Sequence, residues 1–250
     1  RGTAIGHLLE CAGQLTGGYF ADPGAKEVAG LARLGFPMAD VAADGSAILS
    51  KLPETGGLLD LATCKEQLLY ELIDPSAYLQ PDVTADFSGV RFETRGENRI
   101  AILGASGRQR PDALKVSIGY LDGFIGEGQI TYAGPGALGR ARLALDIVRE
   151  RLAMLGLPLA EVRFEIIGLG AVDPRPSAPG FEPREPRIRV AARAEAREAA
   201  EAVGQEVEAL YTNGPAGGGG VSRSVRRVVA VGSALLAREH AAHALNWEMS

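Results

Sequence analysis

Apolar residues recur at helical spacing in several parts of the chain. Between Thr3 and Leu15 an apolar side chain stands at every third or fourth position, and Gly17 follows as a stop signal. The same spacing predicts further helices over residues 60–73, 136–155 and 195–211. Asp60 is a suitable N-cap for the second of these helices, in which Cys64 falls on the apolar stripe while Lys65 and Gln67 lie off it.

Strands alternate with these helices. Asp44-Gly45 predicts a hairpin that joins residues 40–42 to 47–51, and a Gly96–Asn98 turn joins 90–94 to 99–103. Asp122-Gly123 is the favoured dipeptide for a type I′ turn, and it predicts a hairpin between residues 114–121 and 124–132. Further strands are expected at 161–169, 187–192 and 227–236.

The irregular mixture of hairpins and long helices decides the fold class. Regular β-α-β repeats would indicate a Rossmann arrangement, and this chain lacks them. We predict an α+β (mixed α/β) fold, with a mixed or largely antiparallel sheet and long amphipathic helices packed on it. An N-terminal helical and loop section over about 1–80 would precede a ββα-rich section over about 81–250.

One face of the predicted Asp122-Gly123 hairpin is nearly bare. Pairing across a two-residue turn would place Lys115 and Gly119 on the same face as Gly126 and Gly128. Glycines in a strand either admit another backbone at close range or leave room for a ligand. Both interpretations stay open, and in the second Lys115 would stand at the edge of the ligand site.

Composition and charge exclude several classes of protein. The chain has 250 residues, of which 46% are hydrophobic and 23% charged, so it can form a hydrophobic core that needs no disulfides or structural metal for stability. Its net charge of -5 offers no general attraction to nucleic acid or to anionic lipid. No run approaches 18 apolar residues, and two cysteines make no disulfide framework. We expect a cytoplasmic protein that binds neither nucleic acid nor membrane.

The first predicted helix carries a stripe of chemically capable side chains. His7, Glu10, Cys11 and Gln14 follow one another at the spacing that places side chains on one helical face. Solvated faces are usually built from Lys, Glu and Arg, so this composition suits a site as well as it suits plain exposure.

A glycine-rich run lies between the last predicted helix and the last strand. Residues 212–220 read TNGPAGGGG and are followed by Arg223 and Arg226. Successive glycines can turn backbone N–H groups inward as a nest for phosphate or carboxylate, but a flexible loop beside a subunit contact explains the run equally well. His240 and His243 are expected to be surface residues. No serine hydrolase, zincin or C-x-x-C motif occurs.

Five segments together resemble the acyclic terpene utilisation protein AtuA family. They are GHLLECAGQLTGGYFADPG, the TGG of residues 55–57, CKEQLLYELIDPSAYLQPDV, KVSIGYLDGFIGEGQITYAGPGA and EVEALYTNGPAGGGG. The resemblance implies a bacterial protein encoded with genes for degrading citronellol, geraniol and related branched acids through acyl-CoA intermediates. The residues that match family motifs are His7, Glu10, Cys11, Gln14, Lys65, Gln67, Lys115, Glu127, Asn213 and Gly217, Gly218, Gly219 and Gly220.

The resemblance also implies partners. Family members carry a preceding α/β half, so this chain, which begins at Arg1, is expected to be the C-terminal half of the family domain and to act with the missing N-terminal half. A small companion domain, fused or separate, often follows. We further expect a homo-oligomer and a small-molecule carboxylate or acyl-CoA ligand, while no metal site and no particular cofactor are predicted.

Three functions remain open at this point. In an enzyme of branched-acid catabolism, His7 and Glu10 would be general acid and base or would hold a metal, Lys115 would neutralise a developing enolate, and Cys11 would be a possible nucleophile. The other matching residues, with Arg223, would bind substrate. The alternatives are a non-catalytic scaffold or binding subunit of the same pathway and a phosphate-ligand sensor built around Gly217–Gly220.

Overall fold

The computed structural model describes residues 1–173, 175, 178 and 180–241. The chain divides into two compact units, of which the first comprises residues 1–115 with residues 235–241 and the second comprises Val116–Ala234. The sequence led us to expect an N-terminal helical and loop section over about 1–80 and a ββα-rich section over about 81–250. Strands up to residue 108 belong with the N-terminal helices because they share one core with them.

The first unit is built on a four-stranded antiparallel sheet with the order β1-β2-β6-β5. Its strands are β1 (Pro37–Val41), β2 (Ala47–Lys51), β5 (Arg91–Gly96) and β6 (Arg99–Leu103). Both predicted hairpins are confirmed, since β1 pairs with β2 and β5 with β6. A smaller sheet joins β3 (Tyr78–Leu79), β4 (Thr84–Asp86) and β7 (Ser106–Arg108).

Two helices pack with these sheets, α1 (Gly2–Glu10) and α2 (Leu61–Leu69). Both helices and most of the strands contribute apolar side chains to one core, with Leu8, Leu49, Cys64, Phe87 and Ile100 among the buried members. Short 3-10 turns occur at Ala12–Gln14, Leu31–Arg33 and Arg238–His240. The predicted burial of Cys64 is confirmed.

Both helices of this unit are shorter than predicted. The Asp60 carboxylate accepts hydrogen bonds from the N–H groups of Ala62 and Thr63, which confirms the predicted N-cap. However, α2 ends at Leu69, and α1 ends at Glu10 because Ala12 adopts a left-handed conformation with φ of 46°. Residues after each helix are thereby released into loops.

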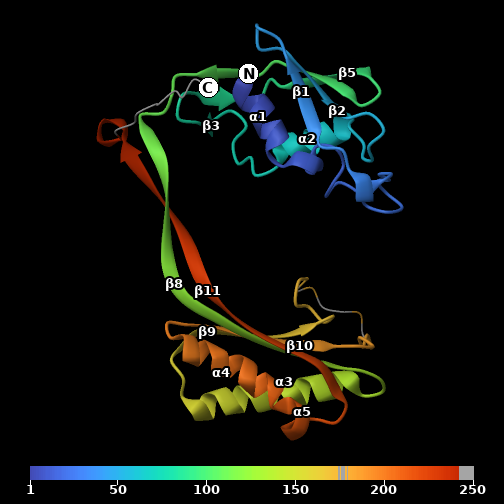
Figure 1. Ribbon diagram of the computed structural model, residues 1–250, viewed down its shortest axis with the longest axis vertical. Helices are drawn as coiled ribbons and strands as arrows, with labels where there is room; N and C mark the ends of the chain where they lie inside the picture. Colours follow the sequence, from blue (N-terminus) through green and yellow to red (C-terminus); the bar gives the residue numbers. More distant parts are fainter. Residues whose placement is uncertain (174, 176–177, 179, 242–250) are drawn as a thin grey trace, which may run out of the picture. The chain divides into compact units, whose positions relative to one another are not determined.

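The second unit has the element order β-α-β-β-α-β. Its members are β8 (Ala113–Tyr132), α3 (Ala137–Leu155), β9 (Leu159–Ile167), β10 (Arg187–Ala194), α4 (Arg197–Glu208), the short α5 (Leu210–Asn213) and β11 (Gly218–Ala237). The strand order is β11-β8-β10-β9, the arrangement of a ferredoxin-like split β-α-β fold. Figure 1 shows α3 and α4 together on one face of this sheet. The predicted α+β class with largely antiparallel sheets is confirmed.

The predicted hairpin at Asp122-Gly123 is wrong. Residues 113–132 form one continuous strand, in which Phe124–Thr131 pair with β10. Gly123 has a φ of 74°, but its Cα lies against the backbone of Ala194, where an added Cβ would come within 2.4 Å of the carbonyl oxygen. Because β10 occupies the space into which a turn would fold the chain, Gly123 forms an irregularity inside the strand.

The bare glycine face is explained by close helix packing. A Cβ at Gly126 would lie 1.7 Å from the carbonyl oxygen of Ala200, and one at Gly128 would lie 2.6 Å from Val207. Both neighbours belong to α4, so the glycines let this helix approach the sheet. Lys115 and Gly119 lie farther along β8, away from this contact, contrary to the predicted face.

The last strand begins earlier than predicted. β11 starts at Gly218, so the last three residues of the predicted glycine-rich loop are strand, and a Cβ at Gly218 would meet Ile130 at 2.7 Å. The helix predicted over 195–211 is also divided, into α4 and α5. His240 lies in the last 3-10 turn and is exposed, as predicted. His243 lies outside the described residues.

We expect Gly126→Ala to destabilise the protein because α4 must move away from β8 to make room for a methyl group. The loss in the free energy of unfolding should be about 1–3 kcal/mol, as for other overpacked cores. Gly119→Ala is the matched control on the same strand, since its Cβ would lie at an ordinary 3.7 Å from Val229. Urea denaturation followed by circular dichroism measures both, and equal stabilities of the two variants would contradict the proposed packing.

Candidate functional site

The break after α1 divides the predicted stripe of chemical residues. His7 is buried in the core, whereas the Glu10 side chain is 64% exposed. Cys11 and Gln14 follow the end of the helix and are partly buried in the turn beyond it. The four side chains therefore do not form one open face, contrary to the prediction, and His7 is separated from solvent.

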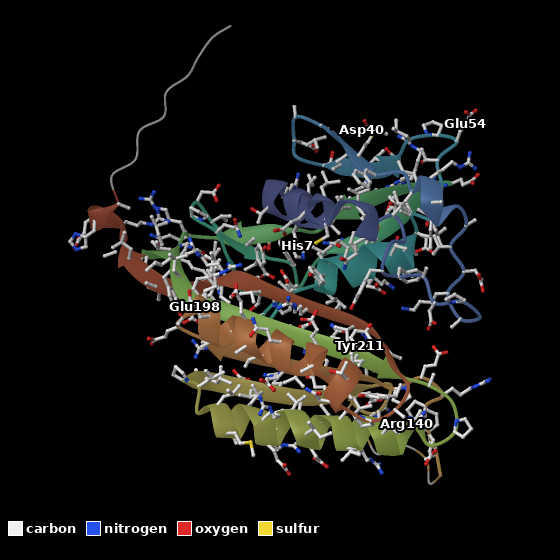
Figure 2. All side chains as sticks on the ribbon, turned by 60° about the horizontal axis from the view of Figure 1, so that its bottom comes forward. His7, Asp40, Glu54, Arg140, Glu198 and Tyr211 are labelled. Carbon is white, nitrogen blue, oxygen red and sulfur yellow. The ribbon has the colours of Figure 1, made fainter. Side chains whose placement is uncertain are left out.

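His7 links α1 to α2 through hydrogen bonds in both directions. Its Nε2 lies 3.1 Å from the carbonyl oxygen of Leu68, and the Gln67 amide donates to the carbonyl oxygen of His7 at 3.0 Å. A carbonyl can only accept, so Nε2 is the donor in this contact. The Nδ1 of His7 stands 3.7 Å from a carboxylate oxygen of Glu10. Figure 2 shows His7 on the helix that carries it.

Aromatic rings enclose the same imidazole. The ring centroids of Tyr78 and Phe87 lie 5.3 Å and 5.7 Å from that of His7, and the two rings stack on each other at 5.1 Å. Burial raises the pKa of Tyr78. These contacts give His7 and Gln67 a structural position, and they correct the prediction that Gln67 lies off the buried face of α2, since Gln67 is fully buried.

A groove of about 730 Å³ opens beside the turn that follows α1. Its lining includes Gln14 of the turn, Glu66 and Leu69 of α2 and Tyr70 directly after α2. The loop after the turn adds the remaining lining residues Tyr19, Phe20, Ala21, Asp22 and Lys26. The Lys26 ammonium lies 3.2 Å from Glu66 and 4.5 Å above the Phe20 ring. The groove thus combines aromatic walls with one cation at its edge.

Strained backbone borders this groove. Ala12, Tyr19 and Glu71 have φ values of 46°, 63° and 54°, a region that residues with a side chain rarely adopt. Such conformations persist only where the surrounding structure imposes them, and they collect at binding and catalytic sites. Ala12 and Glu71 also mark the points where the chain leaves α1 and α2, so the strain and the groove have a common origin.

Buried polar atoms without a partner gather around the same turn. Among the described residues, Nε2 of Gln14, Oε1 of Gln67 and Nδ1 of His7 make no hydrogen bond within the protein. An unsatisfied buried donor or acceptor costs about 1–3 kcal/mol. Gln14 is the member of this group that also lines the groove, and its unpartnered amide nitrogen is buried beneath the groove surface.

The two thiols differ in their surroundings. Burial, reinforced by the charge of Asp60, raises the pKa of Cys64 to about 12, so this thiol stays protonated and unreactive at neutral pH. Cys11 is partly exposed and lies close enough to Tyr70 to influence its titration. The negative charge of Glu71 is the main cause that raises the pKa of the Tyr70 hydroxyl, which keeps this group protonated as well.

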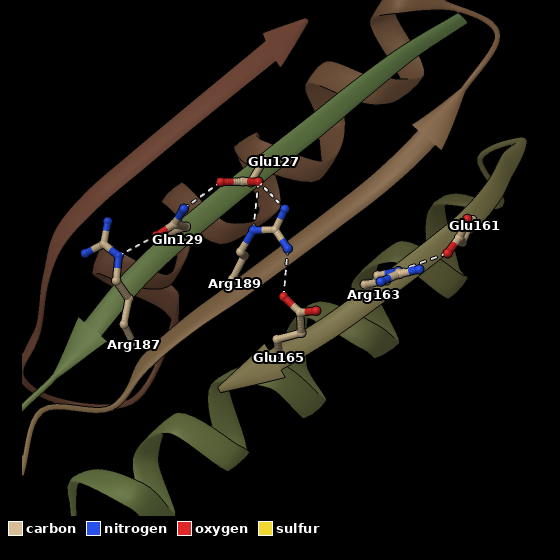
Figure 3. A network of polar contacts seen from close by, with 7 residues as sticks. All are labelled: Glu127, Gln129, Glu161, Arg163, Glu165, Arg187 and Arg189. Atoms are coloured by element: carbon tan, nitrogen blue, oxygen red, sulfur yellow. Dashed lines mark hydrogen bonds and ion pairs between the residues drawn. The ribbon is translucent and has the colours of Figure 1, made fainter. Parts of the chain in front are cut away.

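Glu127, a predicted substrate residue of the second unit, belongs to a network of ion pairs and hydrogen bonds. Figure 3 shows the face of the sheet opposite the helices, where Glu127 binds Arg189 at 2.6 Å and Gln129 at 2.5 Å, and Arg189 also binds Glu165 at 2.7 Å. Burial opposes ionisation of Glu127, but the hydrogen bonds from Arg189 and Gln129 prevail and lower its pKa. The charged groups of this network therefore pair with each other within the protein.

The other predicted residues are dispersed. Lys65 and Lys115 are exposed on α2 and β8, and neither lines the groove. Asn213 is exposed at the end of α5, while Arg223 pairs with Glu208 at 3.2 Å and packs over Gly204 of α4. Since Gly218, Gly219 and Gly220 are part of β11, the structure does not form the predicted nest at Gly217–Gly220 with Arg223 above it.

Sequence reasoning missed Tyr19, Lys26, Glu66 and Tyr70, which line the groove. Tyr19 follows Gly17-Gly18, and this pair indicated only the end of a helix. Lys26 comes within reach because Asp22 and Lys26 form an isolated bridge that closes the loop. Nothing in the local spacing shows that this loop returns to α2.

The described part of the chain contains neither a cluster of metal-binding side chains nor a helix that could span a membrane. Residues 1–173, 175, 178 and 180–241 contain no group of three or more His, Cys, Asp or Glu side chains arranged to hold a metal ion. Within these same residues, no helix combines the length and the apolar character needed to cross a bilayer.

One comparison with known proteins gives a match. The model of the acyclic terpene utilisation family protein AtuA matches residues 1–247. The match extends over nearly the whole chain, so it lends no support to the prediction that the chain is only the C-terminal half of the family domain. Comparison with curated proteins and with solved structures gives no match.

The different burial of the two cysteines predicts selective alkylation. At about pH 8, iodoacetamide should modify Cys11 in the folded protein and leave Cys64 free, because the Cys64 thiol is both buried and protonated. Both should react in urea. Peptide mass spectrometry locates the label, and Cys11→Ser serves as the control that removes labelling of the folded chain. Rapid modification of Cys64 under native conditions would show that the core of the first unit is open.

Proposed function

Because the chain belongs to the acyclic terpene utilisation AtuA family, we propose that it is an enzyme acting on branched, isoprenoid-type carboxylic acids or their acyl-CoA esters. The observation that carries this proposal is the groove beside α1 and α2, in which an unpartnered buried amide and a lysine stand next to exposed aromatic rings. A branched acid has the same two parts, a polar carbonyl end and an apolar chain.

The polar end of such a ligand has two donors available. The Gln14 amide offers N–H groups that have no acceptor in the protein, and the Lys26 ammonium is half exposed. A carboxylate or a thioester carbonyl would accept from both. Lys26 would exchange its surface contact with Glu66 for the ligand, which costs little because exposed ion pairs contribute at most about 1 kcal/mol.

The apolar chain of the ligand has a matching wall. Tyr19 is 89% exposed and Leu69 is 66% exposed, and both line the groove. Burying apolar area is favourable by about 25 cal/mol per Å², so an isoprenoid chain laid on these side chains supplies most of the binding energy. Tyr70 and Phe20 extend the same wall.

Groups for acid–base chemistry stand at the end of α1. Glu10 is an exposed carboxylate, and its charge reaches the hydroxyl of Tyr78. The Tyr70 hydroxyl lies on the groove and is protonated at neutral pH. In this proposal Glu10 is the base, Tyr70 the acid and Cys11 a possible nucleophile, while His7 holds α1 against α2. Tyr70 lines the groove, whereas Glu10 and Cys11 precede the groove residue Gln14 in the chain and are not among the lining residues themselves. The reaction does not require Lys115 or the charged residues of the second unit.

We expect Gln14→Leu and Lys26→Met each to weaken binding of citronellate about tenfold, because each removes one hydrogen bond to a charged group. Lys65→Met is the control, since Lys65 is an exposed lysine on α2 that does not line the groove. Isothermal titration calorimetry measures the affinities. A loss of affinity as large in Lys65→Met, or none in all three variants, would remove the groove from the proposal.

Glu10→Gln tests whether the protein is an enzyme or a non-catalytic scaffold of the pathway. An enzyme that uses this carboxylate as its base should lose about 100-fold or more of its turnover of citronellyl-CoA and keep its affinity for citronellate. Mass spectrometry of the acyl-CoA mixture follows turnover. Binding without turnover in the unaltered protein would instead support the scaffold.

A further inference from the structure

The turn between β8 and α3 carries a glycine pattern that is typical of phosphate-binding loops. Residues 134–139 read GPGALG, so glycines occupy the first, third and sixth positions. The pattern follows a strand, since β8 ends at Tyr132, and it opens a helix, since α3 begins at Ala137. A strand before the glycines and a helix after them are the context in which this pattern indicates a phosphate site.

The backbone of this turn is open to a ligand. Gly134 and Gly136 have φ values of 81° and 73°, which favour glycine. A Cβ added to Gly134 or Gly139 would meet no atom within 4 Å. The N–H groups of Leu138 and Gly139 belong to the first turn of α3, so they lack an acceptor in the helix, and no side chain caps that turn. These two donors therefore remain available.

The charge at the start of α3 is the reverse of what a helix prefers. Its first turn contains no acidic residue, although an acidic residue there would be stabilising. Arg140 follows instead, and Figure 2 shows it at this end of α3. Its guanidinium donates to the carbonyl oxygens of Ala133 and Pro135 at 2.6 Å and 3.0 Å. These neutral acceptors hold the cation beside the turn without compensating its charge, whereas a bound anion would compensate both Arg140 and the helix end.

Two buried polar groups without a partner lie at the same place. Tyr132 is fully buried and shares the core of the second unit with Ala137 and Ala141, so its ring lies beneath the first turn of α3. Among the described residues, neither its hydroxyl nor Nε of Arg140 makes a hydrogen bond. Burial raises the pKa of Tyr132, and the charge of Arg140 opposes this rise, which indicates that the two groups are near each other. The protein supplies donors here and leaves them without an acceptor.

A hollow of about 660 Å³ adjoins the turn. Residues 133–136 form one side of it and residues 182–185 the other. The second side contributes Glu182 and Glu185, both exposed, with Arg184 between them. Carboxylates accept hydrogen bonds from hydroxyl groups but repel further phosphates. The volume is within the range of small-molecule sites, and these side chains favour a ligand with a single phosphate and several hydroxyl groups.

We propose that the turn of residues 134–140 binds the phosphate group of a small phosphate monoester. The N–H groups of Leu138 and Gly139 and the guanidinium of Arg140 donate to the phosphate oxygens, and the hydroxyl groups of the ligand face residues 182–185. A dinucleotide fold would also need an acidic residue on the neighbouring parallel strand, but β10 lies between β8 and β9 here. The site lies within the second unit, so it does not depend on the groove of the first unit.

Isothermal titration calorimetry of the full chain with AMP and with adenosine tests the proposal. AMP should bind at least about tenfold more tightly than adenosine, because only AMP carries the phosphate. Gly139→Glu should weaken AMP binding by about tenfold or more, since its carboxylate competes with the phosphate. The melting temperature of this variant should be unchanged or higher, because an acidic residue stabilises the first turn of a helix. A loss of affinity would then not reflect unfolding.

Met154→Glu is the matched control, because it adds the same charge at an exposed position near the other end of α3 and should leave AMP binding unchanged. Arg140→Gln adds no charge and should also weaken binding about tenfold. The proposal is overturned if AMP does not bind, if adenosine binds equally well, or if Gly139→Glu binds AMP as tightly as the unaltered protein. Ribose 5-phosphate identifies the class of ligand. Affinity equal to that of AMP would support a sugar phosphate, and weaker binding would support a nucleotide.

Discussion

The second unit depends on one close contact between backbones. Gly126 and Gly128 of β8 present no side chain to α4, and the carbonyl oxygen of Ala200 occupies the space in which a Cβ would stand. With the helix seated this closely, the valines of α4 reach the isoleucines of β8 and β10 and complete the core. The opposite face of the same strand, where Glu127 and Gln129 alternate with the glycines, is left for charges. The close approach of α4 thus explains why small and polar residues alternate over positions 126–129 of β8.

The first unit is organised by an exchange of hydrogen bonds between its two helices. His7 donates to a carbonyl of α2, and Gln67 of α2 donates to the carbonyl of His7. Polar side chains in a core are costly unless they are bonded, so this pair permits a single registration of α1 on α2. Because α1 ends where this registration is complete, Cys11 and Gln14 are held beside α2, and the following loop closes the groove.

The sequence predicts local structure well where one residue decides it. Asp60 caps α2 and Asp44-Gly45 turns the first hairpin, since each acts through bonds to its immediate neighbours. Asp122-Gly123 has an equally strong local preference and does not form a turn, because β10, more than sixty residues later, pairs with the strand on one side of it. The burial of Gln67 was not predicted for the same reason, because it depends on a contact with α1, which is distant in the sequence. The resemblance found the family, but the groove residues Tyr19, Lys26 and Tyr70 come together only through the fold.

The two polar surfaces of the molecule differ in what they can still bind. On the sheet of the second unit, Arg189 lies between two carboxylates and Arg187 donates hydrogen bonds to Gln129, Thr131 and Ser222, so both guanidinium groups already have partners within the protein. In the groove of the first unit, the Gln14 amide nitrogen has no acceptor among the described residues, and Lys26 contacts Glu66 and the Phe20 ring. A ligand gains more from groups that lack partners than from groups that must first release them. The unsatisfied groove is therefore the better site for a substrate, although the sheet carries more charge.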